Sequence, residues 1–354
     1  MLIFEYQKLQ IKRRMPTMTI KDIAELAGVS QSTVSLALNN KTGVGEETRK
    51  LIMNIATQYG YNKKSVPIKR NILFIKYIDN GAAIEQNGDF IARIIDAIEL
   101  AASNVGYNLI MKNIQAVDLE NEIREISFED FAGVVWLATE IRTNHVELLT
   151  NISIPVVAVD NMLENHDIDS VVMDNYGGIF TITKYLYELG HREIGYIDST
   201  VRFSNFDQRT EGYLRAIKQL GIPKKEHYIK IVQPTLEGAY NDMLKELETG
   251  AELPTAFVAA NDTIAIGAIK ALRQKGIEMP SQMSVVGFDD IPFCMMLDKS
   301  LTTMRVHKEK LGELAVKLLD SKINNPSDEC IKIIVRPKLV ERESADVPNG
   351  FISG

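Results

Sequence analysis

From Ile72 onward, short apolar runs alternate with longer stretches in which apolar positions recur every three or four residues. The short runs are rich in Val and Ile, which favours buried strands, and the longer stretches are typical of amphipathic helices. Such alternation indicates α/β architecture, with parallel sheets and helices on both faces. Strands are expected at 72–78, 107–113, 133–137, 155–160, 194–197, 256–260 and 284–288. Helices are expected at 91–104, 176–189, 207–220, 236–247 and 262–275.

The length of this α/β part indicates more than one sheet. Residues 72–344 are too many for one doubly wound sheet of this kind, so the pattern predicts two lobes. The first lobe is expected at 72–173 and 306–332, the second at 174–305 and 333–344, and a tail at 345–354.

Before Ile72 the pattern changes to three short helices. Thr19 and Asp22 fit a capping box at the start of the first helix, and Gly28 ends that helix. Ser30 is placed to cap a second helix at 31–38. A third helix is expected at 46–59, with its inward face formed by Leu51, Ile52, Ile55, Ala56 and Tyr59.

The spacing of Ala24, Gly28 and Val34 is the most specific feature of these helices. A helix-turn-helix needs a small residue where its helices cross, a glycine at a left-handed turn, and an apolar residue on the buried face of the second helix. All three requirements are met, which predicts a helix-turn-helix domain at 18–61. A generic three-helix bundle used for protein contacts is the alternative.

Charge divides the chain at nearly the same place. Residues 1–70 contain 12 Lys and Arg against 5 Asp and Glu, whereas residues 71–354 contain 28 against 42. The formal net charge of −7 therefore combines a basic module with a larger acidic one. A basic module fits a polyanion, which the acidic module would repel. A chance fluctuation of surface charge is the alternative.

Several classes of protein are not supported. No window approaches about 18 uninterrupted apolar residues, so no transmembrane helix is expected. Residues 1–14 run from apolar to basic, the reverse of a secretory signal, and the two cysteines form no disulfide framework. We find no phosphate-binding loop, metal-ligand cluster or nucleophile elbow, which predicts a cytoplasmic protein without cofactor, metal or enzymatic activity.

The motif from Thr19 to Ser30, followed by Thr33-Val34-Ser35 and Asn39-Asn40, resembles the opening of LacI/GalR-type transcriptional regulators. Residues 47–49 and 59–62 continue the resemblance. It implies that the second helix lies in the major groove of a double-stranded, pseudo-palindromic DNA operator. The implied DNA-binding residues are Gln31, Ser32 and Leu36 at base edges, Ser30, Thr33, Ser35 and Asn39 near the phosphate backbone, and Thr19. Gln31 suits adenine, whereas Leu36 offers only apolar contact or helix packing.

The segments on either side of this domain depart from the family. Residues 62–71 form a short basic linker, including Lys63 and Lys64, in place of the usual hinge helix. Pro67 disfavours helix at Val66, so we expect an extended linker on DNA phosphates, with a solvated tether as the alternative. For residues 1–17 two interpretations stay open: a basic arm, or a misassigned start before Met15 or Met18.

Polar residues follow several expected strands of the acidic module. Asp160, Asn261 and Asp289 stand at strand ends, and Arg209 lies near a helix start. Ligands of parallel sheets bind beyond the carboxyl ends of strands, and this set of groups suits a hydroxyl-rich small molecule. N-capping is the alternative function for such residues, above all for Asp262 and Asp290.

The resemblance extends through this module to about Arg342, over motifs at 187–192, 209–213, 260–262, 285–292 and 301–303. It implies a two-lobed fold like that of periplasmic binding proteins, with effector contacts from Asp160, Arg209, Asn261 and Asp289. Phe90 and Trp136 are further candidates, each with a core position as the alternative. The loop 79–89 is longer than usual, and His191 resembles a packing residue.

These observations together predict a transcriptional regulator, a repressor that acts as a homodimer and responds to a sugar or a sugar derivative. A cytoplasmic solute-binding protein, or a sequence-tolerant DNA binder without effector control, is the alternative.

Overall fold

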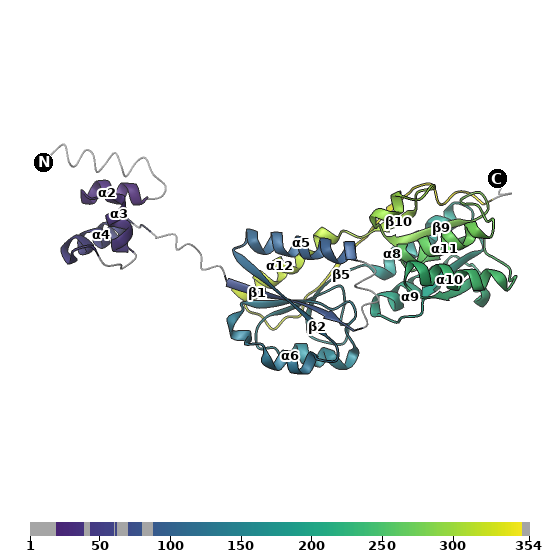
Figure 1. Cartoon of the computed structure of the whole chain (residues 1–354), viewed down its shortest axis with the longest axis horizontal. Coiled ribbons are helices and arrows are strands. Elements are labelled where there is room, and N and C mark those ends of the chain that lie inside the picture. Colours follow the sequence, from purple (N-terminus) through teal and green to yellow (C-terminus); the bar gives the residue numbers. More distant parts are fainter. Residues whose placement is uncertain (1–18, 39–42, 60, 62–69, 80–87, 349–354) are drawn as a thin grey trace. The chain divides into compact units, whose positions relative to one another are not determined.

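The computed structural model describes residues 19–38, 43–59, 61, 70–79 and 88–348. The chain forms two compact units, Met1–Lys69 and Arg70–Gly354, which are described separately (Figure 1). The predictions for residues 1–17, Asn39, Lys63 and Lys64, and for most of the loop 79–89, fall outside the described residues.

The first unit contains the three helices that the sequence predicts: α2 (Ile20–Ala27), α3 (Gln31–Leu38) and α4 (Glu46–Gln58). Their shared core contains Ile23, Ala24, Val34, Ala37, Ile52 and Ala56. The inward placement of Leu51 was wrong, because its side chain is 47% exposed. Leu51 lies about 100° around α4 from Ile52, which puts it at the edge of the buried stripe.

The caps of α2 are those that the sequence indicates. The Thr19 hydroxyl accepts a hydrogen bond from the Asp22 N–H at 3.3 Å, and Asp22 Oδ2 accepts one from the Thr19 N–H at 2.8 Å. Gly28 ends the helix in a left-handed conformation with φ 67°. The turn between α2 and α3 therefore begins at a residue without a Cβ, as the motif requires.

The second unit contains two sheets, each with six strands among the described residues. The first sheet has the order β11-β5-β4-β3-β1-β2, and its neighbouring strands are parallel. Helices α5 (Gly88–Asn104) and α12 (Lys308–Asn324) cover one face, and α6 (Leu119–Glu125) lies on the opposite face (Figure 1). Helix α7 (Val146–Thr150) packs into the same core cluster as α6. Its strands are β1 (Arg70–Ile78), β2 (Tyr107–Gln115), β3 (Gly133–Leu137), β4 (Val156–Val159), β5 (Asp169–Met173) and β11 (Lys332–Val335).

The second sheet has the order β12-β10-β9-β8-β6-β7, with β12 antiparallel to β10. Helices α8 and α9 pack together, as do α10 and α11. Its strands are β6 (Ile194–Ser199), β7 (Ile229–Val232), β8 (Ala256–Ala259), β9 (Ser284–Asp289), β10 (Thr302–Arg305) and β12 (Lys338–Val340). The helices are α8 (Asn175–Glu188), α9 (Ser204–Gln219), α10 (Leu236–Glu248) and α11 (Asp262–Gln274).

The boundaries of the lobes differ from those expected in three places. β1 begins at Arg70, which pairs with Tyr107, so the last two residues assigned to the linker belong to the sheet. β11 pairs with β5, so the chain returns to the second sheet after Val335 and not after residue 332. Residues of the expected tail also take part in the fold, because the Asp346 carbonyl accepts a hydrogen bond from His191 Nε2 at 2.9 Å.

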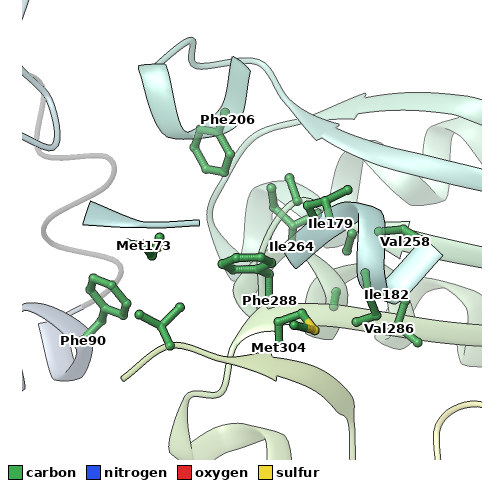
Figure 2. Packing of buried hydrophobic residues seen from close by; sticks show 14 of the residues in the cluster. Phe90, Met173, Ile179, Ile182, Phe206, Val258, Ile264, Val286, Phe288 and Met304 are labelled. Atoms are coloured by element: carbon green, nitrogen blue, oxygen red, sulfur yellow. The ribbon is translucent and has the colours of Figure 1, made fainter. Parts of the chain in front are cut away.

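One apolar cluster extends through both lobes and brings their facing ends together. It includes Phe90 from α5 and Met173 from β5, together with Phe206 and Phe288 from the second lobe, as Figure 2 shows. In the described part of the chain, no helix is long and apolar enough to cross a membrane.

Candidate DNA-binding helix and effector cleft

Helix α3 combines a buried face with an exposed polar start. Val34 and Ala37 are buried against the neighbouring helices, whereas Gln31 and Ser32 are exposed. Ser32 and Leu36 are four residues apart, which places them on one face, roughly opposite Val34. Long and short polar side chains at the start of α3 are therefore available to base edges.

The hydroxyl groups around the start of α3 form a local network. Ser30 Oγ accepts a hydrogen bond from the Thr33 N–H at 3.1 Å and lies 2.7 Å from Ser32 Oγ. The Thr19 hydroxyl donates to Asp22 Oδ2 at 2.5 Å. Ser30 and Thr19 thus fix the ends of helices, and any phosphate contact would add to that capping role.

Leu36 is half-buried on α3, and so are Thr33 and Ser35. A Cβ built on Gly43 would lie 3.9 Å from Leu36 Cδ1, so the leucine borders the loop after α3. This geometry is compatible with both alternatives for Leu36, helix packing and an apolar contact to DNA.

A second candidate site lies between the two lobes of the large unit. Five of the six predicted effector residues line one pocket: Phe90, Asp160, Arg209, Asn261 and Asp289. Asp160 directly follows β4, Asn261 precedes α11, and Asp289 ends β9, so the carboxyl ends of strands supply most of the polar groups. The cavity that these side chains enclose is narrow, with a volume of about 30 Å³, room for one or two water molecules.

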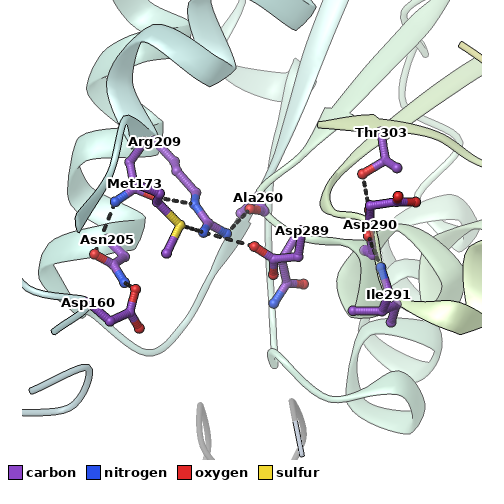
Figure 3. A network of polar contacts seen from close by, with 12 residues as sticks. Asp160, Met173, Asn205, Arg209, Ala260, Asp289, Asp290, Ile291 and Thr303 are labelled. Atoms are coloured by element: carbon purple, nitrogen blue, oxygen red, sulfur yellow. Dashed lines mark hydrogen bonds and ion pairs between the residues drawn. The ribbon is translucent and has the colours of Figure 1, made fainter. Parts of the chain in front are cut away.

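Arg209 is the centre of the polar network in this cleft (Figure 3). Its Nε donates to Asn175 Oδ1 at 2.8 Å, its Nη1 to the Ala260 carbonyl at 2.8 Å, and its Nη2 to Asp289 Oδ1 at 3.1 Å. The guanidinium carbon lies 4.0 Å from the centre of the Phe288 ring. Arg209 is 4% exposed, so these contacts hold a charge that is nearly excluded from water.

Asp160 connects the first lobe to this network. Its carboxylate accepts hydrogen bonds from Thr139 Oγ1 at 2.6 Å and from Asn205 Nδ2 at 3.1 Å, and Asn205 belongs to α9 of the second lobe. Burial raises the pKa of Asp160 to about 6, although these hydrogen bonds and the charge of Arg209 oppose the shift.

The backbone at the cleft is unusual at its two carboxylates. Asp160 has φ 69° and Asp289 has φ 112°, in the region that favours glycine. Burial also raises the pKa of Asp289, against the opposing charges of Arg209 and Lys308. Strained backbone beside desolvated carboxyl groups is typical of positions retained for a ligand.

Comparison with known proteins links the two units to one family. Residues 19–63 match the model of bacterial regulatory proteins of the lacI family, and residues 183–345 match a periplasmic binding protein-like domain. The HTH-type transcriptional repressor PurR of Pasteurella multocida is 31% identical over 329 residues, which cover 92% of this chain and 98% of that protein. The chain belongs to the LacI family.

Other comparisons agree with this membership. The probable HTH-type transcriptional repressor ExuR of Bacillus subtilis is 31% identical over 334 residues, with 92% of this chain and 98% of that protein covered. A complex of the transcriptional regulator CelR with cellobiose has a similar fold, with a TM-score of 0.70, 24% identity and coverage of 92% of this chain and 99% of that one. The lac repressor dimer bound to operator and the anti-inducer ONPF also has a TM-score of 0.70, at 20% identity and 93% and 99% coverage.

This LacI-family chain is a DNA-binding transcriptional repressor and not an enzyme. The predicted fold class, a small helix-turn-helix domain with a two-lobed α/β module, is confirmed.

The assignment of Trp136 to the cleft was wrong. Alternate residues of β3 point to opposite faces of the sheet, and Val135 and Leu137 take the face that carries the interlobe cluster. Trp136 is fully buried in the cluster on the other face, among residues such as Tyr77 and Leu149. It is therefore a core residue of the first lobe.

Sequence reasoning missed several residues that line the LacI-family cleft. Asn205 and Phe206 begin α9, Phe203 precedes it, and Thr139 follows β3. Their position just beyond expected strands was a usable signal, since the same rule found Asp160. In the sequence, Phe203 and Phe206 could not be distinguished from ordinary core residues.

Asn261 lines the pocket and also has a structural role, as do Asp262 and His191 outside it. Asn261 caps α11 by accepting from the Ile264 N–H at 2.9 Å, whereas Asp262 accepts from Thr303 Oγ1 at 2.6 Å and Cys294 Sγ at 3.1 Å. Asp262 is therefore not the cap of its helix. His191 packs as expected, with Nδ1 at 2.8 Å from Thr255 Oγ1.

Proposed function

We propose that this repressor binds a pseudo-palindromic operator as a homodimer, and that a small hydroxyl-rich effector in the interlobe cleft controls its affinity for DNA. The effector is a sugar or a sugar derivative, and the protein acts in the cytoplasm. The cleft network around Arg209, which includes groups from both lobes, is the observation that carries this proposal.

The DNA-binding part of the proposal rests on α3. Gln31 and Ser32 are exposed at its start, and a glutamine amide matches the donor and acceptor pattern of adenine in the major groove. Ser30, Thr33 and Ser35 supply hydroxyl groups for the phosphate backbone, and Asn39, Lys63 and Lys64 extend that set in sequence.

The effector part rests on the chemistry of the cleft. Carboxylates accept hydrogen bonds from sugar hydroxyls, amides both donate and accept, and the Phe90 and Phe206 rings offer apolar faces. Asp160 and Asn205 bond across the lobes, so a ligand that replaces this contact changes how the lobes close. Neighbouring structures that contain cellobiose and ribose agree with this chemistry.

The homodimer is supported by apolar side chains on the surface of the second lobe. Phe293, Met295 and Met296 are 58%, 63% and 73% exposed within and beside one short helical turn at 292–295. A second copy of this chain is the occupant that we assign to this patch, because a two-fold dimer matches two recognition helices to the half-sites of an operator.

A mobility-shift assay with the full-length protein tests the proposal. DNA upstream of the protein's own operon should bind with a selectivity above about a thousandfold over random DNA. Gln31→Ala should lower that selectivity, whereas Asn54→Ala, a change of an exposed polar residue on α4, should leave it unaltered. Equal binding to random DNA would contradict sequence-specific repression, and a sedimentation mass of one chain would contradict the dimer.

A further inference from the structure

The loop 161–168, between β4 and β5, turns several main-chain oxygens toward one side chain, that of Lys332 on β11. An ammonium has three N–H donors, and here four carbonyl oxygens lie within hydrogen-bond distance of it, so it is surrounded as a spherical cation would be. We call these four oxygens the carbonyl cage. They belong to Met162, Leu163, His166 and Ile168, at 2.8, 3.2, 3.1 and 2.6 Å from Lys332 Nζ.

The hydrogen bonds of the loop itself do not account for this convergence. Within the loop, the Leu163 N–H donates to Asn161 Oδ1 at 3.1 Å, the His166 N–H to the Leu163 carbonyl at 3.0 Å, and the Ile168 N–H to the His166 carbonyl at 2.9 Å. These bonds close short turns, and Leu163 is left-handed with φ 49°, which is unfavourable for a residue with a Cβ. Oxygens that carry like partial charges still face one another, and a positive charge between them offsets that repulsion.

Lys332 reaches the loop from the strand that leads to the second lobe. It pairs with Ser170 in the parallel ladder of β11 and β5, and the chain returns to the second sheet a few residues later. Burial lowers the pKa of Lys332, and the nearby acidic groups of Cys330, Asp169 and Asp167 oppose that shift. The cation is therefore partly withdrawn from water, and the carbonyl cage takes the place of its hydration.

The same loop supports the first-lobe side of the cleft. Asp160, which directly precedes the loop, accepts a hydrogen bond from Asn205 of α9 at 3.1 Å. Farther along the loop, Glu164 Oε1 accepts from Gln208 Nε2, also on α9, at 3.3 Å. A change in the shape of the loop would therefore alter two contacts between the lobes.

We propose that the carbonyl cage is a monovalent-cation site that the chain fills with its own Lys332, and that this lysine is a positioning residue for the first-lobe side of the cleft. Rings of main-chain carbonyl oxygens replace the hydration shell of K⁺ in the same way. Because the charge is tethered to β11, the unaltered protein needs no dissolved ion to order the loop. Only the part that concerns the cleft rests on the proposed function.

Hydrogen exchange of the full-length protein tests the cage. Lys332→Met keeps the stem of the side chain and removes its charge, so the loop amides should exchange about tenfold or more faster. Lys332→Arg keeps the charge, but a flat guanidinium does not fit four converging oxygens, so it should also lose protection. Lys338→Met, a change of an exposed lysine on β12, is the control. Unaltered exchange in Lys332→Met, or full protection in Lys332→Arg, would overturn the cage.

Chemical rescue tests whether the cage accepts a free ion. Lys332→Ala leaves space where the stem and the ammonium were, so ammonium or potassium chloride should raise its melting temperature by about 2–4 °C. Tetramethylammonium chloride at the same ionic strength should not, because that cation is too large. The unaltered protein and Lys332→Met should not distinguish the three salts. Equal responses of Lys332→Ala to all three would show that the oxygens do not form a cation site.

A double-mutant cycle tests the link to the cleft. Asp160→Asn removes a desolvated carboxylate and should raise the melting temperature at pH 7. In a Lys332→Met background the loosened loop admits water to Asp160, so this gain should fall by at least half. The effect of Asp290→Asn, which is bonded to Arg305 and Arg342, should be the same in both backgrounds. Equal gains from Asp160→Asn in both backgrounds would contradict the positioning role.

A measurement on the unaltered protein covers the case in which Lys332→Met fails to fold. Reductive methylation followed by mass spectrometry should modify Lys332 at least tenfold more slowly than the exposed Lys338, and equal rates would overturn the cage. Operator binding by the same preparations separates the two proposals. A protein that binds its operator while its loop ignores Lys332 disproves only this inference, whereas a protein with the expected loop response that binds no operator disproves only the proposed function.

Discussion

The two candidate sites of this protein differ in how their residues are brought together. The helix caps and the turn that orient α3 are local, such as the contacts between Thr19 and Asp22, three residues apart. The cleft joins residues far apart in sequence, with 45 positions between Asp160 and Asn205 and 80 between Arg209 and Asp289. The difference teaches that the placement of α3 depends on local backbone conformation, whereas the cleft depends on buried charges held by the whole fold.

The two regions also differ in where their charge lies. Residues 19–61 contain four Lys and Arg and four Asp and Glu, so the helices themselves carry no net charge. The basic excess of the first 70 residues belongs to the segments on either side. In the cleft the charges lie inside the fold, where Arg209 is paired with Asp289 and Asp160 is hydrogen-bonded by the neutral groups of Thr139 and Asn205.

The largest effect is expected from Arg209→Met. The change leaves Asp289, Asn175 and the Ala260 carbonyl without their buried partner, which should lower the free energy of unfolding by about 3–5 kcal/mol. Urea unfolding followed by circular dichroism measures it, with Arg215→Met, an exposed residue of the same helix, as the control. A loss below about 1 kcal/mol would contradict a cleft held together by this ion pair.

The next effect has the opposite sign. The folded pKa of Asp160, raised by burial from 3.8 to about 6, means that the folded state binds this proton more tightly than the unfolded chain. That stabilisation is present below pH 4 and is lost as pH rises from about 4 to 6, so the ionised carboxylate destabilises the fold at pH 7. Asp160→Asn should therefore raise the free energy of unfolding at pH 7 by about 1–3 kcal/mol and flatten its pH dependence.

Asp290→Asn is the matched control for Asp160→Asn. Burial raises the pKa of Asp290, but hydrogen bonds from Arg305 and Arg342 outweigh it and leave that pKa below 3.8. Loss of this carboxylate should therefore destabilise the protein at pH 7. Changes of the same sign in both variants would contradict the pKa shift of Asp160.

A smaller effect is expected in the DNA-binding unit. Gly28 has φ 67° and open space around its missing Cβ, so Gly28→Ala adds no clash and should cost about 1–2 kcal/mol from backbone strain alone. Hydrogen exchange of the α2 and α3 amides in the full-length protein reports this local loss. Gly45→Ala, also in open space but at φ −63°, adds no left-handed strain, so it should change the exchange of the α2 and α3 amides much less, although Ala is a poorer N-cap for α4 than Gly. A similar response to both changes would remove the special role of Gly28.

The same contrast explains how far the sequence could predict the molecule. Caps, the turn glycine and the apolar stripe are local, so the helices of the first unit and their core emerged nearly complete, apart from Leu51. In the second unit most strands and helices were found, but the 17-residue helix α12 and the short strands β5, β7 and β10 were not. Their identity as elements depends on neighbours in the sheet that lie far away in sequence.

For the cleft, the strand-end rule located Asp160, Asn261 and Asp289. It gave no information on which face of a strand looks toward the ligand, and a register difference of one residue separates Trp136 in the core from the cleft face. The contacts of Arg209 with Asn175 and the Ala260 carbonyl were also unpredictable, because they follow from how the helices pack.

The smallest effect concerns the linker and separates charge from base readout. If Lys63 contacts a phosphate, Lys63→Met should reduce the slope of log K against log salt by about 0.9 and weaken all sequences alike. Gln31→Ala should leave the slope unchanged and relax base preference, since its amide carries no charge. Filter binding at four salt concentrations measures both, with Lys224→Met in the second lobe as the control. Because the helices themselves carry no net charge, most of the salt dependence should come from the flanking cations. Equal losses of selectivity from Lys63→Met and Gln31→Ala would show that phosphate contact and base recognition are not separated between the linker and α3.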